Sequence, residues 1–170
     1  MEDRKHTISV MVENKFGVLA RIAGLFSGRG YNIESLTVNH TNNDNVSKMT
    51  IVTSGNETVL EQIEKQLKKL VDVIKVTELT GEEFVERELA LVKVKAIPKN
   101  RAEIIQIVEI FGGKIAIVNK NELGVEISGP GAAIDNFLSL IADFGVIEVA
   151  RTGCVAVARG EGATESHSKL

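Results

Sequence analysis

The chain has 170 residues, of which 44% are hydrophobic and 4% aromatic, so aliphatic side chains must build the core of one large domain or two small ones. A formal net charge of −3 and a pI near 5.7 argue against nucleic acid as the main partner. Because no apolar run approaches the roughly 20 residues needed to span a bilayer and the N-terminus does not resemble a signal peptide, we expect a cytoplasmic protein without a membrane segment.

The first half of the chain predicts strands and helices in the order βαββαβ. Apolar and polar side chains alternate in the first strand, which is typical of a sheet with one buried face. In the helices, apolar side chains recur at spacings of three and four residues and so form one face. The expected strands cover residues 7–12, 31–40, 46–53 and 73–79, and the expected helices cover residues 19–27 and 60–70.

The same order returns in the second half, after a polar linker at residues 81–85. Strands are expected at residues 90–96, 115–118 and 123–128, with one or two more within residues 146–158, and helices are expected at residues 104–111 and 134–141. We therefore predict an α+β fold of two tandem ferredoxin-like βαββαβ domains, at residues 5–80 and 86–159. The polar tail at residues 160–170 is expected to be disordered. This fold serves many unrelated functions and does not decide between them.

The turn between the first strand and the first helix is the segment that points to a binding function. Asn14 precedes this turn, and Gly17 lies where the helix begins. The first N–H groups of a helix have no internal partner and carry a partial positive charge, so a small carboxylate can bind there. Gly17 has no side chain to keep a ligand from the backbone, and the Asn14 amide both donates and accepts hydrogen bonds. The same residues also occur in ordinary capping turns, so the turn alone fits either an amino-acid site or a structural turn.

The second half differs at the equivalent turn. Residues 97–101 contain Pro98 and no glycine at the start of the helix. If one of the two turns binds a small molecule, it is therefore the first. The second domain then needs another role, such as docking a partner.

Groups that could support catalysis or hold a metal are sparse. His6, His40 and His167 lie at the N-terminus, at a strand end and in the tail, and no Ser/His/Asp or Cys/His set has the spacing of a nucleophilic site. His6 and His40 could meet at neighbouring strand ends, but they lack a carboxylate or cysteine partner at ligand spacing, so no metal site is expected. Cys154 lies in an apolar run and is predicted to be buried and unreactive. The third strand also lacks the stacking aromatic residues of an RNA-binding module. We expect a binding or regulatory protein with no catalytic residues.

Several segments, in matching order, resemble one protein family. The first half is similar to an ACT domain, and its segment Gly-Leu-Phe-Ser-Gly-Arg-Gly-Tyr-Asn-Ile-Glu-Ser-Leu-Thr-Val at residues 24–38 resembles the signature of the small, regulatory subunit of acetolactate synthase (acetohydroxyacid synthase). Residues 60–73 are similar to the second helix and fourth strand of that family. Residues 85–89 and 148–153 are similar to its C-terminal domain. The resemblance covers residues 5–159.

The resemblance implies a regulatory role in branched-chain amino-acid biosynthesis. A small subunit of this family raises the activity of a catalytic large subunit and confers feedback inhibition by valine or a related amino acid. Thiamine diphosphate, Mg²⁺ and FAD would belong to the large subunit, with no cofactor in this chain. The effector would lie between the ACT domains of a homodimer. By the family motif, the site would comprise Val12, Asn14, Gly17, Val18 and Leu19 of one copy, with Asn32 and Ile33 of the neighbouring copy.

Other classes of protein fit the sequence less well. A stand-alone ACT sensor for a different enzyme or a transcription factor would have no reason to carry the matches after residue 81. A metal-responsive regulator would need a His/Cys cluster. A thiamine-dependent enzyme would need the Gly-Asp-Gly binding pattern, and the sequence contains neither feature.

Overall fold

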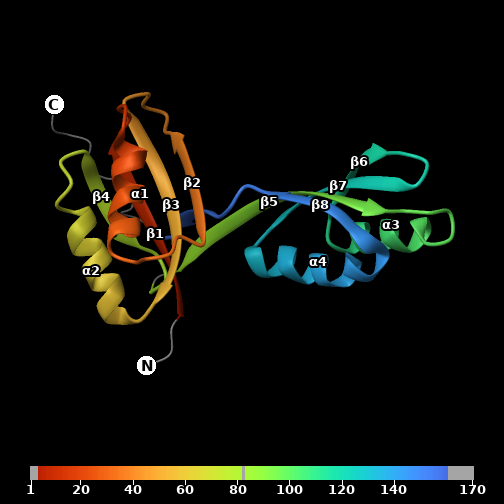
Figure 1. Ribbon diagram of the computed structural model, residues 1–170. Helices are drawn as coiled ribbons and strands as arrows, with labels where there is room; N and C mark the ends of the chain where they lie inside the picture. The colour runs from red at the N-terminus through yellow and green to blue at the C-terminus, as the bar shows by residue number, and fades with distance from the viewer. Residues whose placement is uncertain (1–3, 82, 161–170) are drawn as a thin grey trace. The chain divides into compact units, whose positions relative to one another are not determined.

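The computed structural model describes residues 4–81 and 83–160, so most of the tail expected to be disordered lies outside the described residues. The chain divides into two compact units. The first contains the chain up to Val85 together with the residues from Cys154 onward, and the second contains Glu86–Gly153 (Figure 1). None of the described helices is long and apolar enough to cross a membrane.

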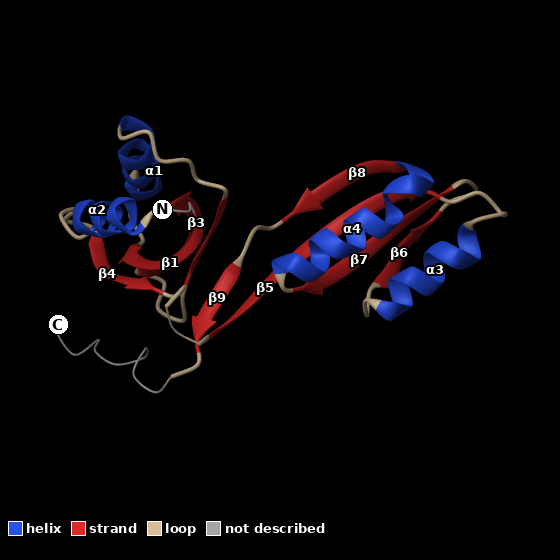
Figure 2. Cartoon of the chain, turned by 90° about the horizontal axis from the view of Figure 1, so that it is seen from below, coloured by secondary structure: helices blue, strands red, loops and turns tan. Residues whose placement is uncertain are grey.

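The first unit has the predicted βαββαβ order. Its elements are β1 (Arg4–Glu13), α1 (Val18–Gly28), β2 (Ser35–His40), β3 (Val46–Gly55), α2 (Glu57–Leu67) and β4 (Val73–Glu78). The strands pair antiparallel in the order β2-β3-β1-β4, and both helices lie on one face of the sheet (Figures 1 and 2). The strand predicted at residues 31–40 begins only at Ser35. Before Ser35 the chain contacts β3 through isolated hydrogen bonds, such as that from the Thr53 hydroxyl to the Asn32 carbonyl (2.7 Å).

Alternating residues of β1 and β3 build the core beneath the helices. Ile8 and Ile51, which pair across the two strands, are completely buried, and they pack in one cluster with Phe26 of α1 and Ile63 of α2. Burying such a side chain contributes about 1.5–3 kcal/mol. The core therefore fixes α1, and with it the turn that precedes the helix.

A short C-terminal strand packs on the first unit. β9 (Val155–Ala158) pairs with β5 (Phe84–Lys95), the strand that runs from the first unit into the second, and the backbone N–H of Arg159 donates to the Glu83 carbonyl (2.9 Å). Cys154 and Ala156 are buried in a cluster with Leu79, and Lys48 Nζ donates to the Ala156 carbonyl (3.1 Å). The strand thus pairs with β5, while Cys154 and Ala156 bury their side chains beside Leu79 of the first unit.

The second unit repeats the same topology. Its elements are β5 (Phe84–Lys95), α3 (Arg101–Ile110), β6 (Lys114–Val118), β7 (Glu122–Gly129), α4 (Gly131–Gly145) and β8 (Val146–Arg151). The strand order β6-β7-β5-β8 matches that of the first sheet, so the tandem ferredoxin-like fold is confirmed. β5 begins at Phe84, inside the expected linker.

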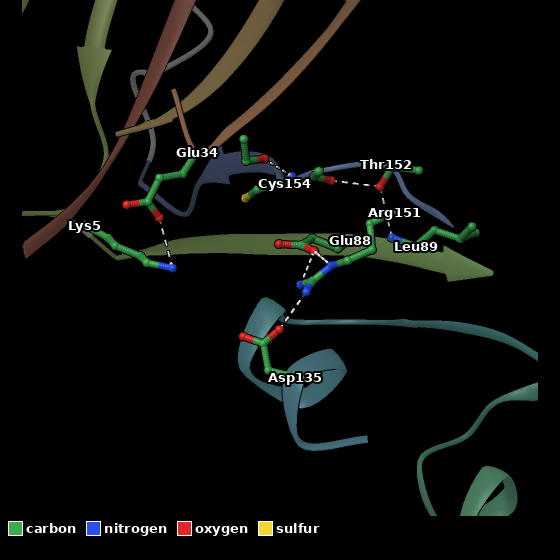
Figure 3. Close-up of polar contacts among 10 residues, drawn as sticks. Lys5, Glu34, Glu88, Leu89, Asp135, Arg151, Thr152 and Cys154 are labelled. Atoms are coloured by element: carbon green, nitrogen blue, oxygen red, sulfur yellow. Dashed lines mark hydrogen bonds and ion pairs between the residues drawn. The ribbon is translucent and has the colours of Figure 1, made fainter. Parts of the chain in front are cut away.

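An arginine joins three elements of the second unit. Arg151, at the end of β8, donates from Nε and Nη2 to Glu88 Oε2 of β5 (2.9 and 2.6 Å) and from Nη1 to Asp135 Oδ1 of α4 (2.6 Å) (Figure 3). Glu88 also packs closely against the first residue of α4, since a Cβ on Gly131 would lie 3.0 Å from Glu88 Oε1. The start of α4 is thereby fixed against β5.

Candidate functional site

The turn between β1 and α1 depends on a glycine in the left-handed region. Gly17 has φ 82° and ψ −6°, and α1 begins at the next residue, Val18. A Cβ on Gly17 would meet nothing closer than Arg21 Nη2, at 3.8 Å. Space is therefore available above Gly17, and the requirement for glycine comes from the backbone angle, which costs other residues roughly 1–2 kcal/mol.

The first turn of α1 is open to an anion. No side chain caps the helix, and its first turn contains no acidic residue. The Val18 N–H makes a long hydrogen bond to the Lys15 carbonyl (3.4 Å), and the next two N–H groups of the helix, those of Leu19 and Ala20, have no carbonyl partner within it. A carboxylate bound here would gain both hydrogen bonds and the favourable end of the helix dipole.

Arg21 adds a full positive charge beside this helix end. Its Nη1 lies 2.8 Å from Asp72 Oδ2, and the Asp72 side chain is only 10% exposed. This ion pair holds the guanidinium near the space over Gly17, where Nη2 lies 3.8 Å from the position of an added Cβ. The sequence interpretation missed Arg21. Its position four residues after Gly17, on the same side of the helix, is the signal that could have found it.

The polar residues of the turn are held by local contacts. Asn14 is exposed, and its Nδ2 donates to the Asp44 carbonyl in the β2–β3 turn (2.7 Å), which uses one of the two N–H donors of the amide. Lys15 Nζ lies 2.5 Å from Glu13 Oε2, and the hydrogen bond to Glu13 raises the pKa of Lys15. The side chains of Asn14 and Lys15 are therefore held by residues beside the turn.

The apolar residues expected at the site fall into two groups. Val12 and Val18 are 1% and 3% exposed and belong to the core, so within one chain they support the turn from below. Leu19 is 42% exposed and lies at the surface, and Phe16, three residues earlier in the chain, is fully exposed. Phe16 is a further surface residue that the sequence interpretation did not include.

Asn32 and Ile33 lie far from the turn within one chain. The Asn32 carbonyl accepts from Thr53, which pairs with His6 near the start of β1, whereas the turn follows Glu13, whose partner is Val46. At about 3.4 Å per residue, the seven positions from Val46 to Thr53 span roughly 24 Å. A site that contains both Gly17 and Asn32 therefore requires two chains.

The equivalent turn of the second unit is filled by its own side chain. Asn100 precedes α3, where Gly17 precedes α1. Arg101 Nη2 donates to the carbonyls of Ala96, Asn119 and Lys120 at 3.0, 2.7 and 2.6 Å. The second turn thus differs from the first in having a guanidinium bonded to backbone carbonyls beside the start of its helix.

The histidines considered as metal ligands do not meet. His6 pairs with Thr53 and His40 with Ser47, at opposite ends of β3. His6 Nε2 lies 3.0 Å from the Gly55 carbonyl, and His40 Nδ1 lies 3.0 Å from the Thr41 carbonyl. Among the described residues, no group of three or more His, Cys, Asp and Glu side chains could hold a metal ion.

Both units match known protein families. Residues 8–75 match the AHAS small subunit-like ACT domain, and residues 87–160 match the small subunit of acetolactate synthase. The chain is 49% identical to the acetolactate synthase isozyme 3 small subunit of Escherichia coli over 158 residues, which cover 92% of this chain and 97% of that protein. It is 48% identical to the acetolactate synthase small subunit of Aquifex aeolicus, covering 92% of this chain and 82% of that protein.

A solved structure extends the likeness to the whole fold. The crystal structure of the acetolactate synthase small subunit from Thermotoga maritima is similar with a TM-score of 0.84 and 42% sequence identity, over 92% of this chain and 98% of that chain. The matches cover both units and agree in the family they indicate. The chain belongs to the family of acetolactate synthase small subunits, which are the regulatory, non-catalytic subunits of that enzyme.

Proposed function

We propose that the chain binds valine or another branched-chain amino acid at the turn before α1 and thereby regulates the catalytic large subunit of acetolactate synthase. The observation that carries the proposal is the start of α1, with Gly17 in the left-handed region, no side-chain cap and no acidic residue in the first turn. The effector carboxylate would bind the N–H groups of this turn. Arg21 would add a charge-assisted contact, which is stronger than a neutral hydrogen bond.

The surface beside the turn favours an aliphatic effector. Leu19 and Phe16 expose apolar side chains on either side of Gly17, so a branched aliphatic side chain can bury its surface against them. One methylene changes the binding free energy by only ~1–3 kcal/mol. Valine, leucine and isoleucine are therefore expected to share the site with different affinities.

The site is completed by a second copy of the chain. Asn32 is exposed and Ile33 is half-buried, and both lie at the end of the sheet remote from Gly17. In a homodimer formed through the ACT domains, these residues of one copy would face the turn of the other. The effector then favours the dimer arrangement that brings the two parts together, and it regulates only to the extent that it binds this arrangement more tightly than another.

The partner in this proposal is the large subunit, which carries the thiamine diphosphate chemistry. The small subunit raises the activity of the large subunit, and the bound amino acid reduces that activation. Where the bound amino acid changes the affinity of the small subunit for the large subunit, the large subunit must change the affinity for valine by the same factor, whereas an effect on the catalytic rate need not be reciprocal.

A calorimetric titration with valine, leucine, isoleucine and, as a control ligand, glutamate tests the proposal. Saturable binding of a branched-chain amino acid is expected in the wild-type chain. Binding should be lost in Gly17→Asp, because the new carboxylate fills the space over the turn and repels the ligand. Gly112→Asp is the matched control, since Gly112 also has a positive φ (67°) and open space around it but lies at the end of α3. Unchanged valine affinity in Gly17→Asp, or no binding with the large subunit present, contradicts the proposal.

A further inference from the structure

The proposed effector residues Asn32 and Ile33 lie close in the chain to Ser35, the first residue of β2. The Ser35 hydroxyl accepts a hydrogen bond from the backbone N–H of Cys154 (2.9 Å). Cys154 immediately precedes β9 and, like β9, belongs to the first unit. A contact with the C-terminal part of the first unit therefore lies three residues after Asn32.

Two further contacts of this segment come from β3, at the centre of the sheet. The Thr53 hydroxyl donates to the Asn32 carbonyl (2.7 Å), and the Glu34 N–H donates to the Val52 carbonyl (2.8 Å). Because β3 pairs with both β1 and β2, the core of the unit fixes these two contacts. The contact from Cys154 differs from them, since its position depends on β9, a strand of only four residues.

Few buried groups hold β9 in place. Ala156 is 3% exposed, whereas Val155 and Val157 are 48% and 60% exposed. Lys48 Nζ donates to the Ala156 carbonyl (3.1 Å), but burial of this ammonium group lowers the pKa of Lys48, so lost hydration offsets part of the gain from the hydrogen bond. Segments with few buried contacts open locally at a lower free-energy cost than core strands. We therefore expect β9 to open and close on a folded first unit.

We propose that the effector closes β9 on the first unit through the hydrogen bond between Ser35 and Cys154. This coupling rests on the proposed function, because it requires an amino acid bound at Asn32 and Ile33. A ligand that binds these residues in their observed position also favours the observed position of Ser35, where its hydroxyl meets the Cys154 N–H. Effector binding and closure of β9 then favour each other, and the coupling between them is reciprocal.

Closure of β9 would also act on the end of the second unit. Thr152 is bonded twice to Leu89 of β5: its hydroxyl accepts from the Leu89 N–H (3.1 Å) (Figure 3), and its own N–H donates to the Leu89 carbonyl (3.0 Å). Gly153, with φ 82°, is the single residue between this anchor and Cys154. A closed β9 thus restricts a glycine that has many backbone conformations open to it when one anchor is released.

Hydrogen–deuterium exchange of the full chain, with and without saturating valine, tests the proposal. Exchange is read by mass spectrometry on peptides that contain Cys154 and β9, and calorimetry measures valine binding in the same sample. Valine should slow exchange in these peptides about fivefold or more, which is the lower end of a typical coupling between two sites. If valine binds and the exchange rates stay the same, the coupling is wrong while the proposed function stands. If valine does not bind, both are wrong.

Substitutions at Ser35 test the hydrogen bond itself. Ser35→Ala removes the acceptor hydroxyl and should abolish the effect of valine on exchange, although valine still binds with an affinity reduced by no more than the same factor. Ser35→Thr keeps a hydroxyl on a residue that strands favour, and it should retain the effect. Ser128→Ala is the matched control, since Ser128 is an exposed serine of β7 in the second unit. An effect of valine in Ser35→Ala equal to that in wild type overturns the proposal.

Discussion

The backbone N–H of Cys154 donates to the Ser35 hydroxyl at 2.9 Å, although the two residues are 119 positions apart in the chain. Ser35 is the first residue of β2, and Cys154 immediately precedes β9. The contact fixes the point at which the chain returns to the first unit. It also defines what a deletion experiment can show, because removing everything after Gly81 would uncover the apolar cluster of Leu79 as well as remove the second unit.

We predict that Ala156→Asp destabilises the full chain by about 3 kcal/mol, because it places a carboxylate in an apolar cluster. Ala156 is 3% exposed and packs with Leu79 and Cys154. Val157→Asp is the matched control: Val157 is 60% exposed, so the change should cost about 1 kcal/mol or less. Urea unfolding of both variants measures the difference. Equal loss in the two variants would show that β9 does not stabilise the first unit.

A shared effector site predicts complementation between two defective chains. Gly17→Asp and Asn32→Ala should each weaken valine binding when assayed alone. In a mixed dimer, one site would combine the intact Gly17 of one chain with the intact Asn32 of the other. An equal mixture should therefore recover about a quarter of the sites, measured as calorimetric stoichiometry after joint refolding. Absence of recovery in a mixture that forms mixed dimers would place Asn32 outside the site.

Asn32→Ala should also still co-purify with the large subunit, and loss of that association would make Asn32 a structural residue.

Arg21→Gln is predicted to raise the dissociation constant for valine about tenfold, which corresponds to about 1.4 kcal/mol, because the charge-assisted contact to the carboxylate is lost. Arg29→Gln serves as control, since Arg29 lies at the other end of α1 and bonds Gln66 (3.0 Å). Arg21→Lys keeps the charge and should lose less affinity. Calorimetric titration with valine measures the dissociation constant, and thermal unfolding checks that each variant is folded. An affinity equal to wild type in Arg21→Gln would remove Arg21 from the proposed site.

The stability of the first unit should depend on pH through Glu34. The hydrogen bond from Ser54, followed by that from Lys5, lowers the pKa of the Glu34 carboxyl. A carboxyl with a lowered folded-state pKa stabilises the fold above its unfolded-state pKa, and this contribution disappears as the pH falls through the folded-state value. Glu34→Gln should therefore be less stable than wild type at neutral pH, and the difference should shrink below about pH 4.

Urea midpoints at about pH 7 and about pH 3 check this dependence. Glu103→Gln, which removes an exposed carboxylate from the first turn of α3, is the reference, and its loss of stability at neutral pH should not exceed ~0.3–1 kcal/mol. A Glu34→Gln difference that stays constant or grows towards low pH would contradict the assigned role of the Ser54 and Lys5 contacts.

The sequence was sufficient for the repeated topology but not for the route of the last strand. Alternation at Ile8 and Val10 and helical spacing at Ile22 and Phe26 report a buried face directly, and each of these residues is in the core. The apolar run that contains Cys154 was likewise interpreted as part of a strand, but such a pattern does not state which residues cover its side chains. In the structure this strand pairs with β5 of the second sheet, and its Ala156 is buried with Leu79 of the first unit.

The candidate site shows the same limit. Gly17 was predicted as a binding residue because it has no side chain, whereas the structure gives a different reason for glycine at this position, its left-handed φ. Val12 and Val18 look like pocket residues in a linear motif, whereas the three-dimensional packing assigns them to the core. The proximity of Arg21 to the space over Gly17 depends on the ion pair with Asp72, a residue from a distant loop that local patterns do not connect to α1.

The return of β9 to the first unit also sets an order of events during synthesis. Domains of a growing chain generally fold as units, with the N-terminal one first. Here the second unit is a continuous segment, Glu86–Gly153, inserted between two parts of the first. The ribosome must release residues 155–158 before the apolar surface around Leu79 is covered. The N-terminal unit would thus be the last to complete its fold, and until then its uncovered face would be the part of the nascent chain most exposed to aggregation.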